Sequence, residues 1–152
     1  MKAQNIWFEE YAESHQNELN QKIHYVCVPA IFFSIVGLVA CIPNGFITST
    51  LGISSSVFGN WAGLTLAILM IFYARLSIKT FILMAVFSIV CLYGNYYLST
   101  VAPLLLTSLG IFVVAWIGQF YGHKVEGKKP SFLKDIQFLL IGPAWVFEKM
   151  TL

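Results

Sequence analysis

Charged residues are scarce in this chain and nearly absent from its middle. They make up 11% of the 152 residues, whereas hydrophobic residues make up 58%. Between Ile23 and His123 the only charged side chains are Arg75 and Lys79. A soluble domain carries roughly 25% charged residues, and a chain with so few could not cover its surface with them. The composition therefore excludes an ordinary soluble domain and predicts an integral membrane protein.

Several common motifs are also missing. The chain has no GxGxxG, P-loop or GxSxG sequence, so it offers no visible site for flavin, nicotinamide, nucleotide or serine-hydrolase chemistry. Cys27, Cys41 and Cys91 lie in apolar runs without a CxxC pair, which indicates buried thiols rather than disulfides. A net charge of +2 is too small to indicate a nucleic-acid partner. The polar first 25 residues do not resemble a cleavable signal peptide.

Four apolar runs predict the architecture. They cover residues 26–42, 57–74, 81–98 and 101–118. Each is near the lower end of the range of about 17–25 residues that a spanning helix needs. We expect an all-α membrane bundle of four transmembrane helices, forming a single domain over residues 1–152.

The positive charges predict the orientation of this bundle. All nine Lys and Arg residues fall in the two ends of the chain or in the loop of Arg75 and Lys79, and the other two loops have none. By the positive-inside rule, four spans then place both termini in the cytoplasm. The compact ends favour a bacterial inner membrane over the endoplasmic reticulum.

The two ends, residues 1–25 and 119–152, are expected to be cytoplasmic or interfacial. Residues 3–16 predict an interfacial helix. Residues 136–147 are apolar but too short to span, and we expect a re-entrant or interfacial segment broken at Gly142-Pro143. Five aromatic residues are predicted to form belts at the membrane interface: Trp7, Tyr11, Trp116, Tyr121 and Trp145.

The chain has three histidines, and the predicted topology places all of them at the cytoplasmic boundary. His15 and His24 precede the first span, and His123 follows the fourth. Three imidazoles on one side of a bundle could bind Fe, Zn, Cu or Ni. On one continuous helix, however, His15 and His24 would point in opposite directions, because nine residues are 2.5 turns. A new helix starting at Asn17, a good N-cap, would remove this conflict.

The residues around the histidines could support such a site. Asn20 precedes His24 by four residues, so both lie on one helix face. Asn20 could therefore form a hydrogen bond to the imidazole of His24 and fix its tautomer without binding the metal itself. Glu126 follows His123 by three residues, and two histidines with one carboxylate are the ligands of many non-haem iron oxygenases. The residues Gly118 and Gly122 permit close helix approach. The alternative without a metal is that the histidines only form hydrogen bonds near the lipid head groups and that Glu126 is a solvated surface charge.

Two stretches resemble the small membrane family that includes the fungal 2-hydroxy-fatty-acid dioxygenase of phytosphingosine metabolism. The first is Tyr11-x3-His15-x-Asn17-x2-Asn20-x3-His24-x4-Pro29. The second is Trp116-Ile-x-Gln119-Phe120-x-Gly122-His123, followed by Glu126 and Pro130. These motifs cover about a third of the chain. The apolar spans between them match only in hydrophobicity.

The resemblance implies an Fe(II)-dependent dioxygenase that uses O2 to shorten a 2-hydroxy fatty acid by one carbon, releasing CO2. It implies that His15, His24 and His123 bind the metal, with Glu126 as a further candidate ligand. Four residues are expected to surround these ligands: Tyr11, Asn17, Asn20 and Gln119. Arg75, Lys79 or Lys22 would balance the charge of the substrate carboxylate.

The resemblance also implies that neither flavin nor nicotinamide is required. The expected partners are the fatty acid, O2 and membrane lipids, and the oligomeric state is left open. Two other functions stay open at this point. One is a zinc-dependent membrane lipid hydrolase at the same histidines. The other is a non-catalytic scaffold or transporter subunit.

Overall fold

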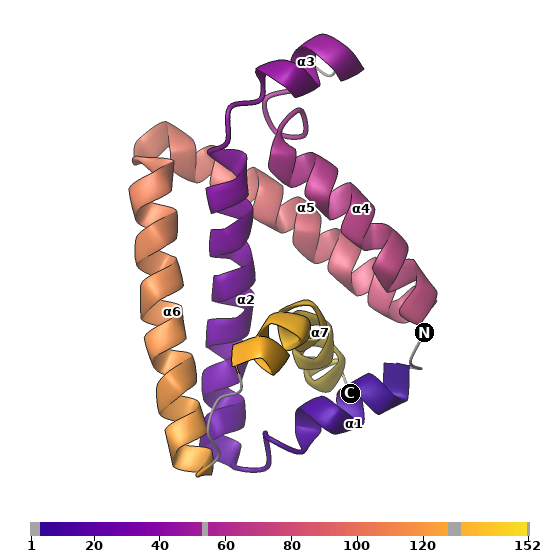
Figure 1. Ribbon diagram of the computed structural model, residues 1–152, viewed down its shortest axis with the longest axis vertical. Helices are drawn as coiled ribbons and strands as arrows, with labels where there is room; N and C mark the ends of the chain where they lie inside the picture. The colour runs from indigo at the N-terminus through magenta and orange to yellow at the C-terminus, as the bar shows by residue number, and fades with distance from the viewer. Residues whose placement is uncertain (1–3, 53–54, 128–131, 152) are drawn as a thin grey trace. The chain divides into compact units, whose positions relative to one another are not determined.

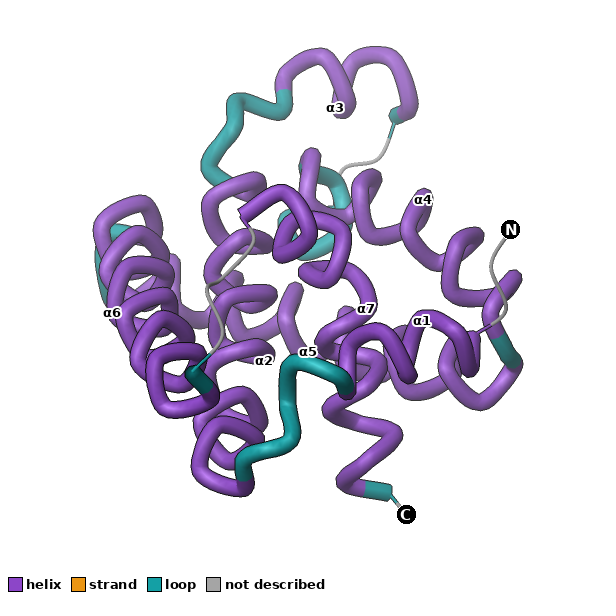
Figure 2. Tube along the Cα trace, turned by 60° about the horizontal axis from the view of Figure 1, so that its bottom comes forward, coloured by secondary structure: helices purple, strands orange, loops and turns teal. Residues whose placement is uncertain are grey.

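The computed structural model describes residues 4–52, 55–127 and 132–151, and it describes side chains in the last stretch from residue 138 onward. These residues form helices and loops and contain no strand, which confirms the all-α prediction (Figure 2). The helices are α1 (Gln4–Ala12), α2 (Glu18–Ala40), α3 (Gly45–Leu51), α4 (Trp61–Leu76), α5 (Ile78–Val101), α6 (Leu104–Glu126) and α7 (Phe132–Met150).

Three of the described helices are long and apolar enough to cross a membrane. These are α2, α5 and α6, with 23, 24 and 23 residues. At 1.5 Å per residue each is roughly 35 Å long, enough for a hydrocarbon core of about 30 Å. Helix α4, in the place of the predicted second span, has 16 residues and is shorter than a usual span. The structure thus supports membrane association, and the four-span layout stays a prediction.

Two helices extend beyond the predicted spans 26–42 and 101–118, in each case at the end that carries a histidine. Helix α2 begins at Glu18, well before the apolar run, and α6 continues through the polar residues up to Glu126. Hydropathy detects the apolar middle of a helix and misses its polar turns. These polar turns carry His24 and His123.

The chain divides into two compact units, and residues 4–32 and 112–151 belong to the first. Here α1 packs against α7, and the first part of α2 lies against the last part of α6 (Figure 1). A Cβ added at Gly118 would lie 2.6 Å from Sγ of Cys27, and one added at Gly122 would collide with Oδ1 of Asn20. The prediction that these glycines allow close helix approach is confirmed.

The core of the first unit contains two aromatic residues that were predicted to lie in interface belts. Tyr11 is 4% exposed and Trp145 is 2% exposed, and both belong to a buried cluster with Val28 and Val146. The belt prediction is wrong for these two residues, because α7 covers the face of α1 that the sequence alone leaves open to the interface.

Helix α7 also differs from the predicted broken segment. It runs through Pro143 without interruption over 19 residues. A proline removes one main-chain donor and bends a helix, but tertiary packing can hold the two sides together. At Gly142, a Cβ would lie 3.1 Å from the hydroxyl of Tyr11, so this glycine lets α7 approach the tyrosine closely.

The second unit covers the described residues between 33 and 111, where α4 and α5 lie side by side (Figure 1). Ser77 separates them and caps α5, accepting a hydrogen bond from the main chain of Thr80. In α5, the amide of Asn95 donates to the carbonyl oxygens of Phe33 and Cys91. Such bonds satisfy polar groups within an apolar helix pair.

Candidate metal centre

Three buried histidines meet in the first unit. His15 lies in the loop between α1 and α2, His24 lies in the second turn of α2, and His123 lies in the last turn of α6. Their side chains are 2%, 1% and 7% exposed, respectively. One ring nitrogen from each lies within 4.8 Å of the others. The structure therefore brings together the three residues that the sequence singled out.

The break between α1 and α2 makes this convergence possible. Helix α1 ends at Ala12 and α2 begins at Glu18. The side-chain oxygen of Asn17 accepts hydrogen bonds from the main-chain nitrogens of Leu19 (2.9 Å) and Asn20 (3.4 Å). This is the predicted N-cap. Because the chain turns here, His15 folds back onto the face of α2 that carries His24.

Main-chain carbonyl oxygens orient two of the imidazoles. Nδ1 of His15 lies 2.5 Å from the carbonyl oxygen of Tyr11, and Nδ1 of His24 lies 2.9 Å from that of Asn20. A carbonyl oxygen only accepts, so each Nδ1 carries the proton and each Nε2 keeps its lone pair. This tautomer is the one suited to a metal ligand. Asn20 thus orients His24, as expected, but through its main chain.

The side chain of Glu126 joins the His15 loop to the end of α6. Its carboxylate accepts hydrogen bonds from the main-chain nitrogens of Gln16 and Asn17, both at 2.9 Å, and from Nδ2 of Asn20 at 3.0 Å. Both carboxylate oxygens are engaged in these bonds. Among the described residues, the group with metal-binding geometry consists of the three histidines.

Aromatic rings pack around His15 and around its neighbour Tyr11. The Tyr11 ring stacks on the His15 imidazole, with centroids 4.1 Å apart and planes at 6°. Trp145 and Phe138 contact Tyr11, at centroid distances of 5.0 and 5.3 Å. Sequence reasoning missed Phe138 and placed Trp145 elsewhere, because neither lies in helical spacing with a histidine.

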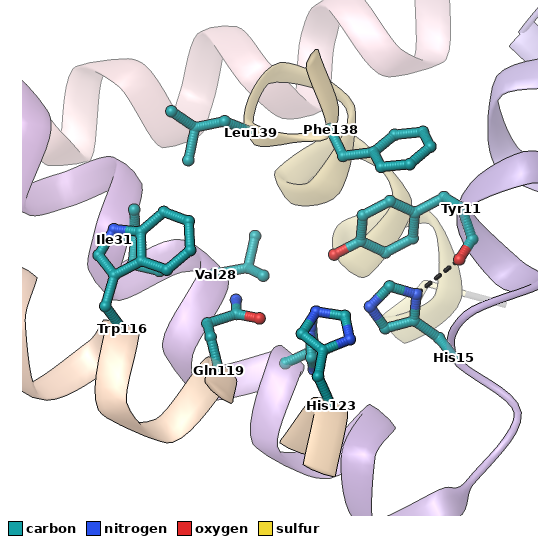
Figure 3. A pocket seen from close by; sticks show the side chains of 10 residues that line it. Tyr11, His15, Val28, Ile31, Trp116, Gln119, His123, Phe138 and Leu139 are labelled. Carbon is teal, nitrogen blue, oxygen red and sulfur yellow. Dashed lines mark hydrogen bonds between the residues drawn. The ribbon is translucent and has the colours of Figure 1, made fainter. Parts of the chain in front are cut away.

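A small cavity of about 30 Å³ lies beside the histidines, and Figure 3 shows the residues that line it. Its polar wall contains the histidines, Tyr11 and Gln119. Its remaining lining is apolar or aromatic: Val28, Ile31, Trp116, Phe138 and Leu139. A cavity of this volume has room for about two water molecules, so its lining resembles that of a small-molecule site but a larger ligand would have to open it.

The lining residues of α2 and α6 repeat at helical spacing, and of these the sequence had indicated only Gln119 as a neighbour of the ligands. Val28 and Ile31 follow His24 by four and seven residues on α2, and Gln119 and Trp116 precede His123 by four and seven residues on α6. Residues at this spacing share one helix face. On both helices the lining is polar near the histidine and becomes apolar with distance from it, at Val28 on α2 and at Trp116 on α6.

The predicted cationic residues do not line this cavity. Lys22 is exposed on α2, while Arg75 and Lys79 are exposed at facing ends of α4 and α5 in the second unit. The lining contains no Lys or Arg among the described residues. The role of Arg75 and Lys79 as counter-ions stays a prediction.

The donor set fits a metal ion. Three nitrogens bound to one ion at about 2.1 Å lie about 3.4–3.6 Å from one another, so the observed nitrogens, which lie within 4.8 Å of one another, would have to approach by roughly 1 Å. Burial disfavours the charged imidazolium and thus favours the neutral form that binds metals. Three such imidazoles in an apolar setting are chemically suited to a transition metal.

Comparison with known proteins identifies the family of this chain. No individual curated protein and no solved structure matches the chain significantly. A sequence model of one protein family, however, matches residues 1–152. On this match over its full length, the chain belongs to the family described as 2-hydroxy-palmitic acid dioxygenase Mpo1-like.

Proposed function

We propose that the chain is an iron(II)-dependent dioxygenase that converts a 2-hydroxy fatty acid and O2 into the fatty acid one carbon shorter, CO2 and water. The observation that carries this proposal is the cluster of three buried histidines in a member of this family. The conversion of R-CHOH-COOH to R-COOH and CO2 releases four electrons, and reduction of O2 to water accepts four. Flavin or nicotinamide is therefore not required.

His15, His24 and His123 would hold the iron through neutral imidazoles. When bound, iron(II) would supply the redox chemistry that allows O2 to react with an organic substrate. The main-chain carbonyls of Tyr11 and Asn20 keep His15 and His24 in the tautomer with Nε2 available. The protein thus contributes a preorganised set of donors, which reduces the reorganisation that metal binding requires.

The apolar residues of the cavity wall would contact the alkyl chain of a fatty acid once the cavity, about 30 Å³ in this structure, opens to admit it. Val28, Ile31 and Leu139 offer aliphatic contact, and Trp116 and Phe138 add aromatic rings. Burying methylene groups there would stabilise the complex by about 0.8 kcal/mol each. The same wall excludes bulk water from the histidines, which protects reactive oxygen chemistry from side reactions. A hydroxyl and a carboxylate at the polar end would then face the metal.

Glu126 and Asn17 would act as positioning residues. Their hydrogen bond ties the loop of His15 to the helix of His123, so the separation of these two imidazoles depends on it. We therefore propose three histidines as the protein ligands and assign Glu126 to the support of the site. The charge of the substrate carboxylate would be balanced by the bound cation itself.

The test is metal analysis of anaerobically purified protein, followed by measurement of O2 uptake and CO2 release with 2-hydroxypalmitate. We expect close to one iron per chain and production of pentadecanoic acid. Each of the variants His15→Ala, His24→Ala and His123→Ala should lose iron and activity. Tyr121→Phe, on an exposed face of α6, is the matched control. Full iron and activity in all three histidine variants would overturn the assignment.

The same measurement separates the alternatives. Three imidazoles also bind Zn²⁺. A colourless zinc protein that hydrolyses lipid esters without O2 would favour a lipid hydrolase. Protein without stoichiometric metal would favour a scaffold or transporter subunit. The cytoplasmic location of both termini and the bacterial inner membrane are further proposals, testable with reporter fusions at each end.

A further inference from the structure

Gln119 is a buried polar residue beside the histidine cluster. It lies in α6, one turn before His123, and its side chain is 7% exposed. It lines the cavity, and Figure 3 shows its carboxamide pointing toward the space that Tyr11 and His123 also face. Among the described residues no hydrogen bond to the carboxamide of Gln119 is found, and its polar atoms are not among the fully buried ones without a partner, so they are accessible from the cavity.

An unpartnered carboxamide in this position calls for an explanation. Most side-chain amides in protein interiors are hydrogen-bonded to protein groups or to water. Gln119 also lies within a helix that is long and apolar enough to cross a membrane. Polar groups inside such helices tend to line functional cavities. A ligand that enters the cavity would satisfy the amide.

The surroundings of Gln119 define the chemistry of that ligand. On one side lie the imidazoles of His24 and His123, and on the other side the wall becomes apolar at Val28 and Trp116. No Lys or Arg lines the cavity among the described residues. A suitable ligand therefore has an oxygen-rich head next to the histidines and an alkyl chain directed away from them.

We infer that Gln119 is a substrate-binding residue that hydrogen-bonds the 2-hydroxy-carboxylate head, and that it distinguishes 2-hydroxy acids from unsubstituted fatty acids. This inference rests on the proposed function. A carboxamide has one acceptor oxygen and an NH2 donor. The 2-hydroxyl can donate to that oxygen, while the carboxylate accepts from the NH2 group. An unsubstituted acid satisfies only the donor and leaves the acceptor unpaired.

The variant Gln119→Met tests this role, because methionine has a similar length and shape but cannot donate a hydrogen bond. We expect KM for 2-hydroxypalmitate to rise roughly tenfold or more, since a site built to bond a hydroxyl loses that discrimination without the bond. Iron content should be unchanged. The inhibition constant of palmitate should change by much less. The ratio of the inhibition constant of palmitate to KM for 2-hydroxypalmitate should therefore fall.

A second variant, Gln119→Glu, distinguishes a role in substrate binding from a purely structural role. It keeps the size and polarity of the side chain but places a carboxylate beside the carboxylate of the substrate. We expect a larger rise in KM than for Gln119→Met, with iron still bound. Tyr121→Phe, on the exposed face of the same helix, should match the wild type in both constants.

The results separate this inference from the proposed function. If wild-type protein consumes O2 with 2-hydroxypalmitate but both iron-loaded Gln119 variants keep its KM and its preference over palmitate, the inference is overturned and the function stands. If wild-type protein binds no iron and shows no turnover, the function and the inference that depends on it both fall. A Gln119→Met protein that loses its iron would place Gln119 in support of the metal and would also overturn the inference.

Discussion

The carboxylate of Glu126 accepts a 2.9 Å hydrogen bond from the main-chain nitrogen of Asn17, 109 residues earlier in the sequence. Asn17 caps α2, and Glu126 ends α6. One contact therefore links the start of the helix that carries His24 to the end of the helix that carries His123. The loop of His15 is held by the same carboxylate, through Gln16.

Replacing Glu126 by glutamine should weaken metal binding without abolishing it. Three N–H donors point at this carboxylate, and glutamine would offer them a single acceptor oxygen and an NH2 group that repels them. We expect iron affinity to fall by about 10–100-fold, the loss that is usual when a residue that supports the metal ligands through hydrogen bonds is replaced. Activity at saturating iron should largely return. Glu9→Gln, exposed on α1, is the control. Loss of activity even at saturating iron would instead identify Glu126 as a ligand.

Adding one methyl group at Gly122 should disturb the site. A Cβ there would collide with Oδ1 of Asn20 and lie 3.4 Å from Cε1 of His24. We expect Gly122→Ala to push α6 away from α2 and to lower iron affinity at least tenfold. Gly110→Ala on the same helix has no atom within 4 Å of its new Cβ and should bind iron like wild type. Equal iron titrations for the two variants would contradict this packing argument.

The ring of Tyr11 should matter more than its hydroxyl for the stability of the first unit. Tyr11→Ala removes a buried ring that stacks on His15 and contacts Trp145. We expect the free energy of unfolding in detergent to fall by about 3–5 kcal/mol, as for other buried aromatic residues. Tyr11→Phe keeps the ring and should change it by less than half as much. Tyr97→Ala, exposed on α5, should be close to neutral.

Metal removal should lower thermal stability. An ion that binds only the folded chain stabilises it by about 2.7 kcal/mol at a free concentration of 100 times Kd. Chelator-treated protein should therefore show a lower Tm, and adding Fe²⁺ under anaerobic conditions should restore it. His24→Ala should show no such recovery. A similar rise in Tm for wild type and His24→Ala would show that the ion acts elsewhere.

Local features of this structure could be read from the sequence. The helix break at Asn17 follows from capping chemistry together with the spacing of His15 and His24. The close approach of α2 and α6 follows from Gly118 and Gly122. Both depend on residues near one another in the chain or on one helix, where propensity and periodicity act directly.

Features that depend on tertiary packing could not be read in this way. Burial of Tyr11 and Trp145 requires α7 to pack on α1, and a sequence pattern does not specify which interfacial face is covered. The donors to Glu126 lie in the loop before α2 and in its first turn, more than 100 residues earlier, so the spacing of Glu126 from His123 does not reveal these bonds. Continuation of α7 through Pro143 likewise depends on what the helix packs against.

The order of the three histidines in the chain has a consequence for biosynthesis. His15 and His24 are made early, but His123 follows only after α3, α4 and α5 have been synthesised. Trp145, which contacts the ring that stacks on His15, comes later still. A partly made chain therefore has at most two of the three imidazoles and lacks the aromatic cover. Under the proposed function, a metal ion could therefore bind all three imidazoles only after α6 has been made, and a chain that stops before α6 would lack the complete site.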